Sequence, residues 1–365
     1  MTVRKHLGAL AAAALIAVAA LPAFAQDWQA GAGDDWKQML AAAKKEGTVV
    51  VAGPPEIGKP MAEGFKRDTG IELEFLGAVG ATMVQRMSRE YKSGNVTVDV
   101  VFSGAVTLAM TEYMEPLKSK LILPGVTDPK NWIGGQMKFA DNAGTYIPYF
   151  GEQVSGYPLA NTDQVKPGSV TSWNDLLKPQ FKGKIAIYDP RVPGPGVATS
   201  VFIADALGLE FVKKLYVDQQ PKFSRDSRQL VEWVARGVHP IAVGVSFNEI
   251  ENFKSNGIKN IDIIEMPNAP LRVTASFYPH VPKKAPHPNA ALVFMKWYAS
   301  KPGQEINSRE QVMASRRTDV VIPGQPESIR PKPGVYYNDQ YAEDFVLNKR
   351  DKLIEEVRKI VGEDK

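Results

Sequence analysis

A repeated order of strand, glycine-containing turn and helix is the feature that most constrains the fold of this chain. Between residues 48 and 104, short apolar segments end in such turns, and helical patterns separate them. These segments are Thr48–Ala52, Ile71–Phe75 and Val98–Phe102. Strands that alternate with helices usually pair in parallel and are covered by helices on both faces. The sequence therefore predicts an α/β fold with parallel strands.

The rest of the chain contains further elements of the same kind. Gly47 and Gly70 are predicted to end the helices on either side of the first strand. Residues 124–160 are rich in glycine, proline and aromatic residues and predict irregular connections with a crossing strand. With 365 residues, and about 150 residues per domain, the chain is long enough for two lobes. Later helices are expected at Trp173–Leu177, Val197–Leu207, Asn289–Tyr298 and Asn348–Val361, the last capped by Asn348, and strands at Lys184–Tyr188, Ile241–Gly244 and Ile261–Ile264.

The first 25 residues have the pattern of a secretory signal peptide. Arg4 and Lys5 precede an apolar run, and Ala23-Phe24-Ala25 supplies a cleavage site. The apolar run is about 15 residues long, whereas a membrane-spanning helix needs ~20, which disfavours an anchor. We therefore expect cleavage after Ala25 and export to the periplasm. Cleavage lowers the basic count from 44 to 42 against 40 acidic residues, for a mature charge of +2.

Composition excludes several classes of function. The chain has no cysteine, which excludes disulfides, thiolate metal sites and a cysteine nucleophile. Its formal charge of +4 comes from nearly balanced basic and acidic residues without a basic run, so we expect no nucleic-acid partner.

The turns at the carboxyl ends of the strands form the candidate ligand site. In open parallel sheets ligands bind there, beside helix N-termini. Small residues let the backbone approach a ligand, and Arg191 adds a guanidinium that suits carboxylate or phosphate. The alternative is that these glycines serve only as turn and cap residues. The candidate ligand-binding residues are Pro55, Gly80, Ala81, Thr82, Ser103, Gly104, Tyr188, Arg191, Gly194, Gly196, Thr199, Ser246 and Phe247.

Longer stretches resemble a known family. They are Asp99–Gly104, Asn161–Asp163, Thr171–Leu177, Phe181–Ala186 and Ala285–Gln304. On these segments the chain resembles the periplasmic solute-binding proteins of ABC transporters, family 1, in the branch of the ferric-ion-binding proteins. The resemblance implies a type II fold: two α/β lobes, a ligand cleft between them, and hinge strands crossing near 152–160 and 274–282. It also implies a lobe 1 of residues 26–151 plus 279–328, a lobe 2 of residues 152–278 plus 329–365, and an ABC permease as partner.

The chain departs from the iron-binding members of this family at their ligand positions. Pro55 lies in the turn where they usually offer a histidine, and Gly104 lies where they often offer a glutamate. Ser246 and Phe247 replace their tyrosine pair. His239, His280 and His287 show no metal-ligand spacing, so we expect them to be structural or surface residues and expect no metal and no cofactor.

The leading hypothesis is a monomeric, non-catalytic protein that delivers a small organic or phosphorylated anion to a permease. Arg191 and the helix starts would hold the anion, while Tyr188 and Phe247 stack on a ring or pack in the core. An alternative is uptake of ferric iron or an iron chelate through Tyr146, Tyr149 or Tyr157. A secreted hydrolase using Ser103 or Ser246 is disfavoured, because neither serine lies in the Gly-x-Ser-x-Gly motif of serine hydrolases.

Overall fold

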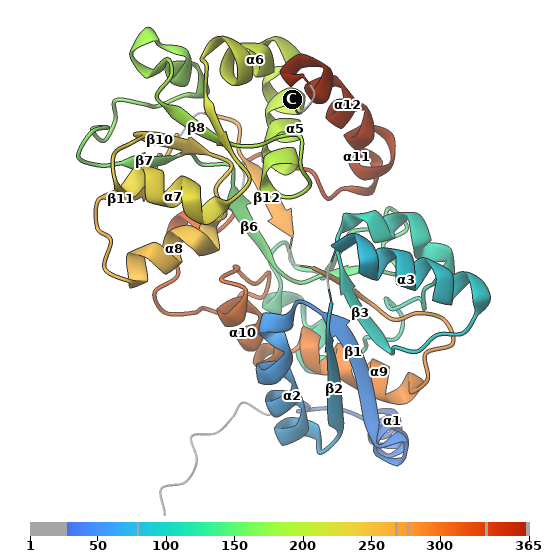
Figure 1. Cartoon of the computed structure of the whole chain (residues 1–365). Helices are drawn as coiled ribbons and strands as arrows, with labels where there is room; N and C mark the ends of the chain where they lie inside the picture. Colours follow the sequence, from blue (N-terminus) through green and yellow to red (C-terminus); the bar gives the residue numbers. More distant parts are fainter. Residues whose placement is uncertain (1–27, 79, 267–268, 276, 333–334, 363–365) are drawn as a thin grey trace, which may run out of the picture.

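The computed structural model describes residues 28–78, 80–266, 269–275, 277–332 and 335–362, so the predicted signal peptide lies outside the described residues. Two α/β lobes are joined by a small sheet, with the last helices beside lobe 2 (Figure 1). No helix in the described ranges is long and apolar enough to cross a membrane.

Lobe 1 is built on a sheet of strand order β13-β3-β1-β2. Strand β1 pairs in parallel with β2 and β3, as predicted, whereas β13 is antiparallel to β3. Gly47 and Gly70 end α1 and α2 with φ of 82° and 75°, as predicted. The lobe comprises α1 (Asp34–Glu46), β1 (Thr48–Gly53), α2 (Pro55–Thr69), β2 (Glu72–Gly77), α3 (Gly80–Ser93), β3 (Val100–Ser103), the 3₁₀ helix η1 (Ala105–Tyr113), α4 (Pro124–Thr127), β4 (Lys138–Phe139), β5 (Pro148–Tyr149), β13 (Tyr278–His280), α9 (Pro288–Ala299) and α10 (Lys301–Glu310).

Lobe 2 is built on a sheet of order β11-β7-β10-β8-β9. Strand β8 is parallel to β9 and β10, but β7 is antiparallel to both β10 and β11. The parallel pairing predicted for the first strands does not extend to β7 and β13, because each enters its lobe directly from a crossing strand. The lobe comprises β7 (Leu159–Asn161), the 3₁₀ helices η3 (Trp173–Leu177) and η4 (Pro179–Phe181), β8 (Ile185–Tyr188), α5 (Pro195–Leu207), α6 (Leu209–Lys213), β9 (Lys222–Ser224), α7 (Ser227–Ala235), β10 (Ile241–Val243), α8 (Phe247–Ser255) and β11 (Ile261–Ile263).

The hinge sheet joins the lobes. Strands β6 (Glu152–Ser155) and β12 (Arg272–Ala275) pair in antiparallel fashion, with Arg272 opposite Ser155 and Thr274 opposite Gln153. A third strand, β14 (Asn338–Asp339), pairs in parallel with β12 and was not predicted. The lobes are thus connected at a sheet that also includes the C-terminal part of the chain.

The C-terminal segment forms two helices rather than the single helix expected. Helix α11 (Glu343–Asn348) ends before α12 (Arg350–Val361), and Lys349 breaks the helix with φ −122° and ψ −36°. The prediction of Asn348 as the cap is therefore wrong: it is the last residue of α11.

Residues 338–348, which we call the C-terminal strap, contact both lobes. On the lobe 1 side, Lys138 Nζ lies 2.9 Å from Asp339 Oδ2, and the backbone N–H of Asn142 donates to Glu343. On the lobe 2 side, Asn338 donates to Asp205 at 2.6 Å, and α12 packs on α5 and α6. Residues 329–365, which the resemblance implies to belong to lobe 2, thus also contact lobe 1.

Candidate functional site

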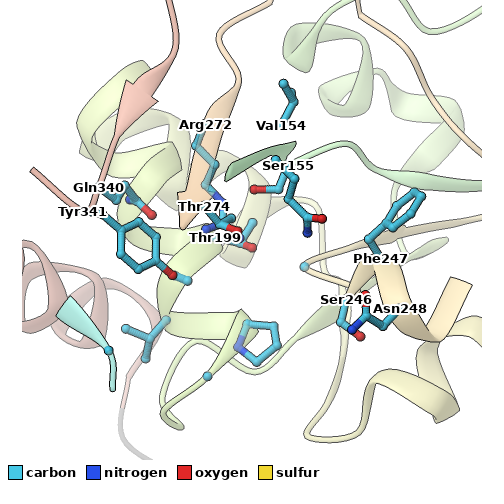
Figure 2. A pocket seen from close by; sticks show the side chains of 18 of the residues that line it. Val154, Ser155, Thr199, Ser246, Phe247, Asn248, Arg272, Thr274, Gln340 and Tyr341 are labelled. Carbon is cyan, nitrogen blue, oxygen red and sulfur yellow. The ribbon is translucent and has the colours of Figure 1, made fainter. Parts of the chain in front are cut away.

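A cavity of about 510 Å³ lies between the lobes (Figure 2). Lobe 1 contributes the turn at Gly104, and lobe 2 contributes the beginnings of α5 and α8. The hinge strands and Tyr341 of the C-terminal strap complete its wall. In Figure 2, Arg272, Thr274 and Thr199 lie between Tyr341 on one side and Ser246 on the other. Both lobes, the hinge sheet and the C-terminal strap therefore contribute residues to this cavity.

One face of the hinge sheet supplies the polar wall of the cavity. Side chains alternate between the two faces of a strand, so Gln153 and Ser155 share a face, as do Arg272 and Thr274. The cross-strand register places these two pairs opposite one another, and all four residues line the cavity. Val154 and Val273 alternate with them and are buried, and Val154 also borders the cavity. The alternation of polar and apolar residues thus builds the cavity wall directly.

Arg272 is the main charged group of this wall. Its side chain is buried, with 8% exposed, and its Nε has no hydrogen-bond partner within the described ranges. No ion pair to a carboxylate is found for it in the same ranges. Burial lowers the pKa of the guanidinium, and the nearby phenols of Tyr341 and Tyr216 only partly oppose this effect. A buried, uncompensated cation is costly unless an anion pairs with it.

The beginnings of α5 and α8 lie at the same cavity. Pro195 is the first residue of α5, and Gly194 before it has φ 118°, a conformation that favours glycine. Ser246 precedes α8 without bonding to its N–H groups through its side chain. Both helices present their N-terminal partial positive charge at the cavity, which adds to that of Arg272.

The structure brings together only part of the candidate set. Gly104, Gly194, Thr199, Ser246 and Phe247 line the cavity. The other candidates are Pro55, Gly80, Ala81, Thr82, Ser103, Tyr188, Arg191 and Gly196. Gly80, Ala81 and Thr82 begin α3, and their side chains lie outside the described residues. The other five are not among the residues that line the cavity.

Arg191 has a structural partner instead of a place in the cavity wall. Its Nε and Nη2 donate to the two carboxylate oxygens of Asp189 at 2.8 and 2.9 Å, and its guanidinium lies 5.4 Å from the ring centre of Phe223. Burial alone would raise the pKa of Asp189, but hydrogen bonds from Arg191 and Arg225 outweigh burial and lower it. Arg191 is thus bound to Asp189 in this structure, and its expected contact with an anion stays a prediction.

Two further candidates have local structural roles, whereas the buried hydroxyl of a third, Ser103, has no hydrogen-bond partner among the described residues. The hydroxyl of Tyr188 donates to the carbonyl of Arg225 at 2.7 Å. At Gly196, an added Cβ would lie 2.1 Å from the carbonyl oxygen of Asp189, so the glycine permits a close backbone approach. Ser103 lies on β3, opposite Tyr278 of β13, with its hydroxyl buried.

Comparison with known proteins decides the family. A family model described as bacterial extracellular solute-binding protein matches residues 47–310. The chain belongs to this family. A search of curated protein sequences finds no match.

Solved structures of other solute-binding proteins share the fold. Iron-bound HitA from Pseudomonas aeruginosa is 15% identical, with a TM-score of 0.65 over 86% of this chain and 99% of that one. A Trichodesmium protein in complex with iron and citrate gives the same values. The periplasmic binding protein AfuA from Actinobacillus pleuropneumoniae, with fructose-6-phosphate bound, is 15% identical, with a TM-score of 0.62 over 86% of this chain and 98% of that one. At these identities the likeness establishes the two-lobe fold of this solute-binding protein.

Two of the tyrosines considered as iron ligands lie in different surroundings in this solute-binding protein. Of the three tyrosines considered, Tyr157 lines the cavity, and burial raises its pKa to about 12. Tyr149 is buried between Lys138 and Arg316, whose charges disfavour a cation there. No group of three or more histidine, cysteine, aspartate or glutamate residues that could hold a metal ion occurs in the part of the chain described.

The sequence analysis did not identify the residues of the hinge sheet that line the cavity. The alternation in Gln153-Val154-Ser155 and Arg272-Val273-Thr274 was readable, and both segments lie at or beside the expected crossings. That pattern, combined with the cleft that the resemblance implies, could have identified Arg272. No comparable sequence pattern indicates that Tyr341 lines the cavity. It does so because of the path of the C-terminal strap, which was not expected.

Proposed function

We propose that this solute-binding protein captures a small organic anion in the interlobe cavity and delivers it to an ABC permease. The observation that carries the proposal is Arg272, a buried guanidinium that faces the cavity without a carboxylate partner among the described residues. The only carboxylate side chain lining the cavity within those residues is Glu56, which is exposed at its rim. An anionic group beside Arg272 would compensate its charge.

Two similar structures agree with an anionic ligand. AfuA was solved with fructose-6-phosphate bound, and the Trichodesmium protein was solved with citrate together with iron. Both molecules carry the carboxylate or phosphate groups that a guanidinium binds with paired hydrogen bonds.

Substitution of Arg272 tests the proposal. Native mass spectrometry of protein purified from its own periplasm would identify the bound anion, and calorimetry would measure its affinity. A charge-assisted pair contributes roughly 1.5–3 kcal/mol, so Arg272→Gln should weaken binding at least about tenfold. Arg236→Gln is the matched control, because this arginine is exposed, pairs with Glu232 and is not among the residues that line the cavity. Equal affinities for Arg272→Gln and the parent protein would refute the proposal.

Iron uptake is the competing function within the family. The protein we propose binds its anion without iron, so it should lack a visible tyrosine–iron absorption band. A band with stoichiometric iron that disappears in Tyr157→Phe would replace the anion proposal with iron transport. Robust hydrolysis of generic esters or glycosides would likewise contradict a purely binding role.

We further propose periplasmic export and a monomeric protein with the lobe boundaries stated above. The intact mass of the exported protein should correspond to a chain that begins at Gln26. Retention of residues 1–25 would contradict cleavage.

A further inference from the structure

We propose that the ligand is a polyhydroxylated organic anion, whose charged group pairs with Arg272 and whose hydroxyl groups bind along Gln153, Ser155 and Thr274. This inference rests on the anion binding proposed above. It concerns the uncharged part of the ligand, which Arg272 does not specify.

Gln153 provides the first argument. Its side chain is 9% exposed, and its Oε1 has no hydrogen-bond partner in the described structure. An amide oxygen accepts hydrogen bonds and cannot donate them, so it needs a donor from the ligand. An ionised carboxylate or a fully ionised phosphate monoester offers only acceptors, whereas a hydroxyl group offers the missing donor. Such an anionic group can accept from the Gln153 amide nitrogen but does not supply the donor that Oε1 lacks.

Ser155 and Thr274 extend this polar surface. The hydroxyl of Ser155 is buried and also lacks a partner within those ranges. Ser155 is opposite Arg272, and Thr274 is opposite Gln153, so the four side chains form a compact patch on one face of the hinge sheet. Side chains directly opposite each other are about 5 Å apart, and those two residues apart on one strand are about 7 Å apart. Several neighbouring hydroxyl groups of one small polyol can reach a patch of that size together.

The size of the cavity provides an independent argument. Its volume of about 510 Å³ lies within the range for organic ligands, roughly 300–1,000 Å³, and far exceeds a bare inorganic anion. The walls beyond the patch contain further hydroxyl and amide groups at Thr199 and Asn248, with Phe277 among the apolar neighbours. A purely aliphatic anion would cover Gln153 without bonding it, and a hydroxylated one would satisfy it.

Calorimetry with matched ligands tests this inference. For a phosphate head group, the series is inorganic phosphate, hexyl phosphate and a hexose 6-phosphate; for a carboxylate, it is hexanoate and gluconate. Sites built to bond a ligand hydroxyl strongly reject analogues that lack it, so we expect at least roughly 100-fold tighter binding of the hydroxylated member in the series whose head group fits. Which series shows this preference distinguishes a phosphate from a carboxylate.

Gln153→Met removes the acceptor at nearly constant volume. It should weaken binding of the hydroxylated anion at least about tenfold and leave hexyl phosphate or hexanoate unchanged. Equal binding of the hydroxylated and aliphatic members to the parent protein would refute the inference, whether or not this variant folds, while anion binding would stand. Retention of every anion by Arg272→Gln would instead refute the proposed function.

Discussion

The histidine buried in lobe 1 should make this protein unstable in acid. His280 is fully buried on β13, and its Nε2 lies 2.8 Å from the hydroxyl oxygen of Tyr91. Its Nδ1 has no partner among the described residues. Burial lowers the pKa of His280 to about 4. The ring therefore stays neutral in the folded protein well below the pH at which an exposed histidine takes up a proton.

The sign and size of the effect follow from the difference between the two pKa values. In the unfolded chain the pKa is about 6.5, so below that pH the unfolded state binds a proton that the folded state excludes. The folded state loses stability as pH falls from about 6.5 towards about 4. With a folded pKa of about 4, the loss between about pH 7.5 and about pH 4.5 is about 2.5 kcal/mol for this single group.

Urea unfolding of the ligand-free parent and of His280→Gln measures this loss. Carboxylates titrate in both proteins, so their contributions largely cancel in the difference between the two unfolding free energies. Between about pH 7.5 and about pH 4.5, the unfolding free energy of the parent should fall by about 2.5 kcal/mol more than that of His280→Gln. As a second measurement, the NMR signals of the His280 ring in the folded protein should not titrate above about pH 5. A difference that is independent of pH would refute the argument.

Further substitutions test other parts of the structure. Arg191→Ala should lower the free energy of unfolding by about 1–3 kcal/mol, because it leaves the buried carboxylate of Asp189 without this partner. It should leave ligand affinity unchanged. A tenfold loss of affinity with full stability would instead make Arg191 a ligand contact. Gly196→Ala should cost about 1–3 kcal/mol through its clash with the backbone at Asp189, whereas Gly104→Ala, with open space around it, should be neutral in denaturant unfolding. Val346→Asp should detach the C-terminal strap from lobe 1, and small-angle X-ray scattering of the unliganded protein should then show a larger radius of gyration; an unchanged radius would show that the strap does not hold the lobes.

The elements of the fold were predictable wherever local chemistry decides the conformation. Gly47 and Gly70 end their helices because glycine adopts the left-handed conformation without steric cost, and this property is readable in the sequence. The direction of β7 and β13 was not predictable from the same patterns. It depends on where each strand enters its lobe, and this is a property of the whole chain path.

The candidate site was predictable only in its outline. The glycine turns indicated the correct side of the lobe 2 sheet, and Thr199 and Ser246 lie at the cavity as expected. Arg191 and Arg272 are the same residue type, and nothing local to either shows which has a carboxylate partner. Asp189 is two residues from Arg191 and bonds it, while Arg272 has only valine and leucine beside it in sequence. The absence of a nearby acid beside a strand arginine is a weak signal, but it indicates the arginine that lines the cavity.

The path of the chain through the two lobes has a kinetic consequence. The lobe 2 sheet takes all its strands from one continuous stretch, Leu159 to Ile263, whereas the lobe 1 sheet needs β13 and its core needs α9. Contacts between β1 and α9 close a loop of more than 200 residues, and long loops slow folding. We therefore expect the sheet of the second lobe to form first, with α12 packing on it later, and the sheet of the first lobe to remain incomplete until β13 and Pro288–Ala299 are available. In a newly made chain the sheet of the N-terminal lobe is thus completed last, and this lobe directly follows the predicted export signal.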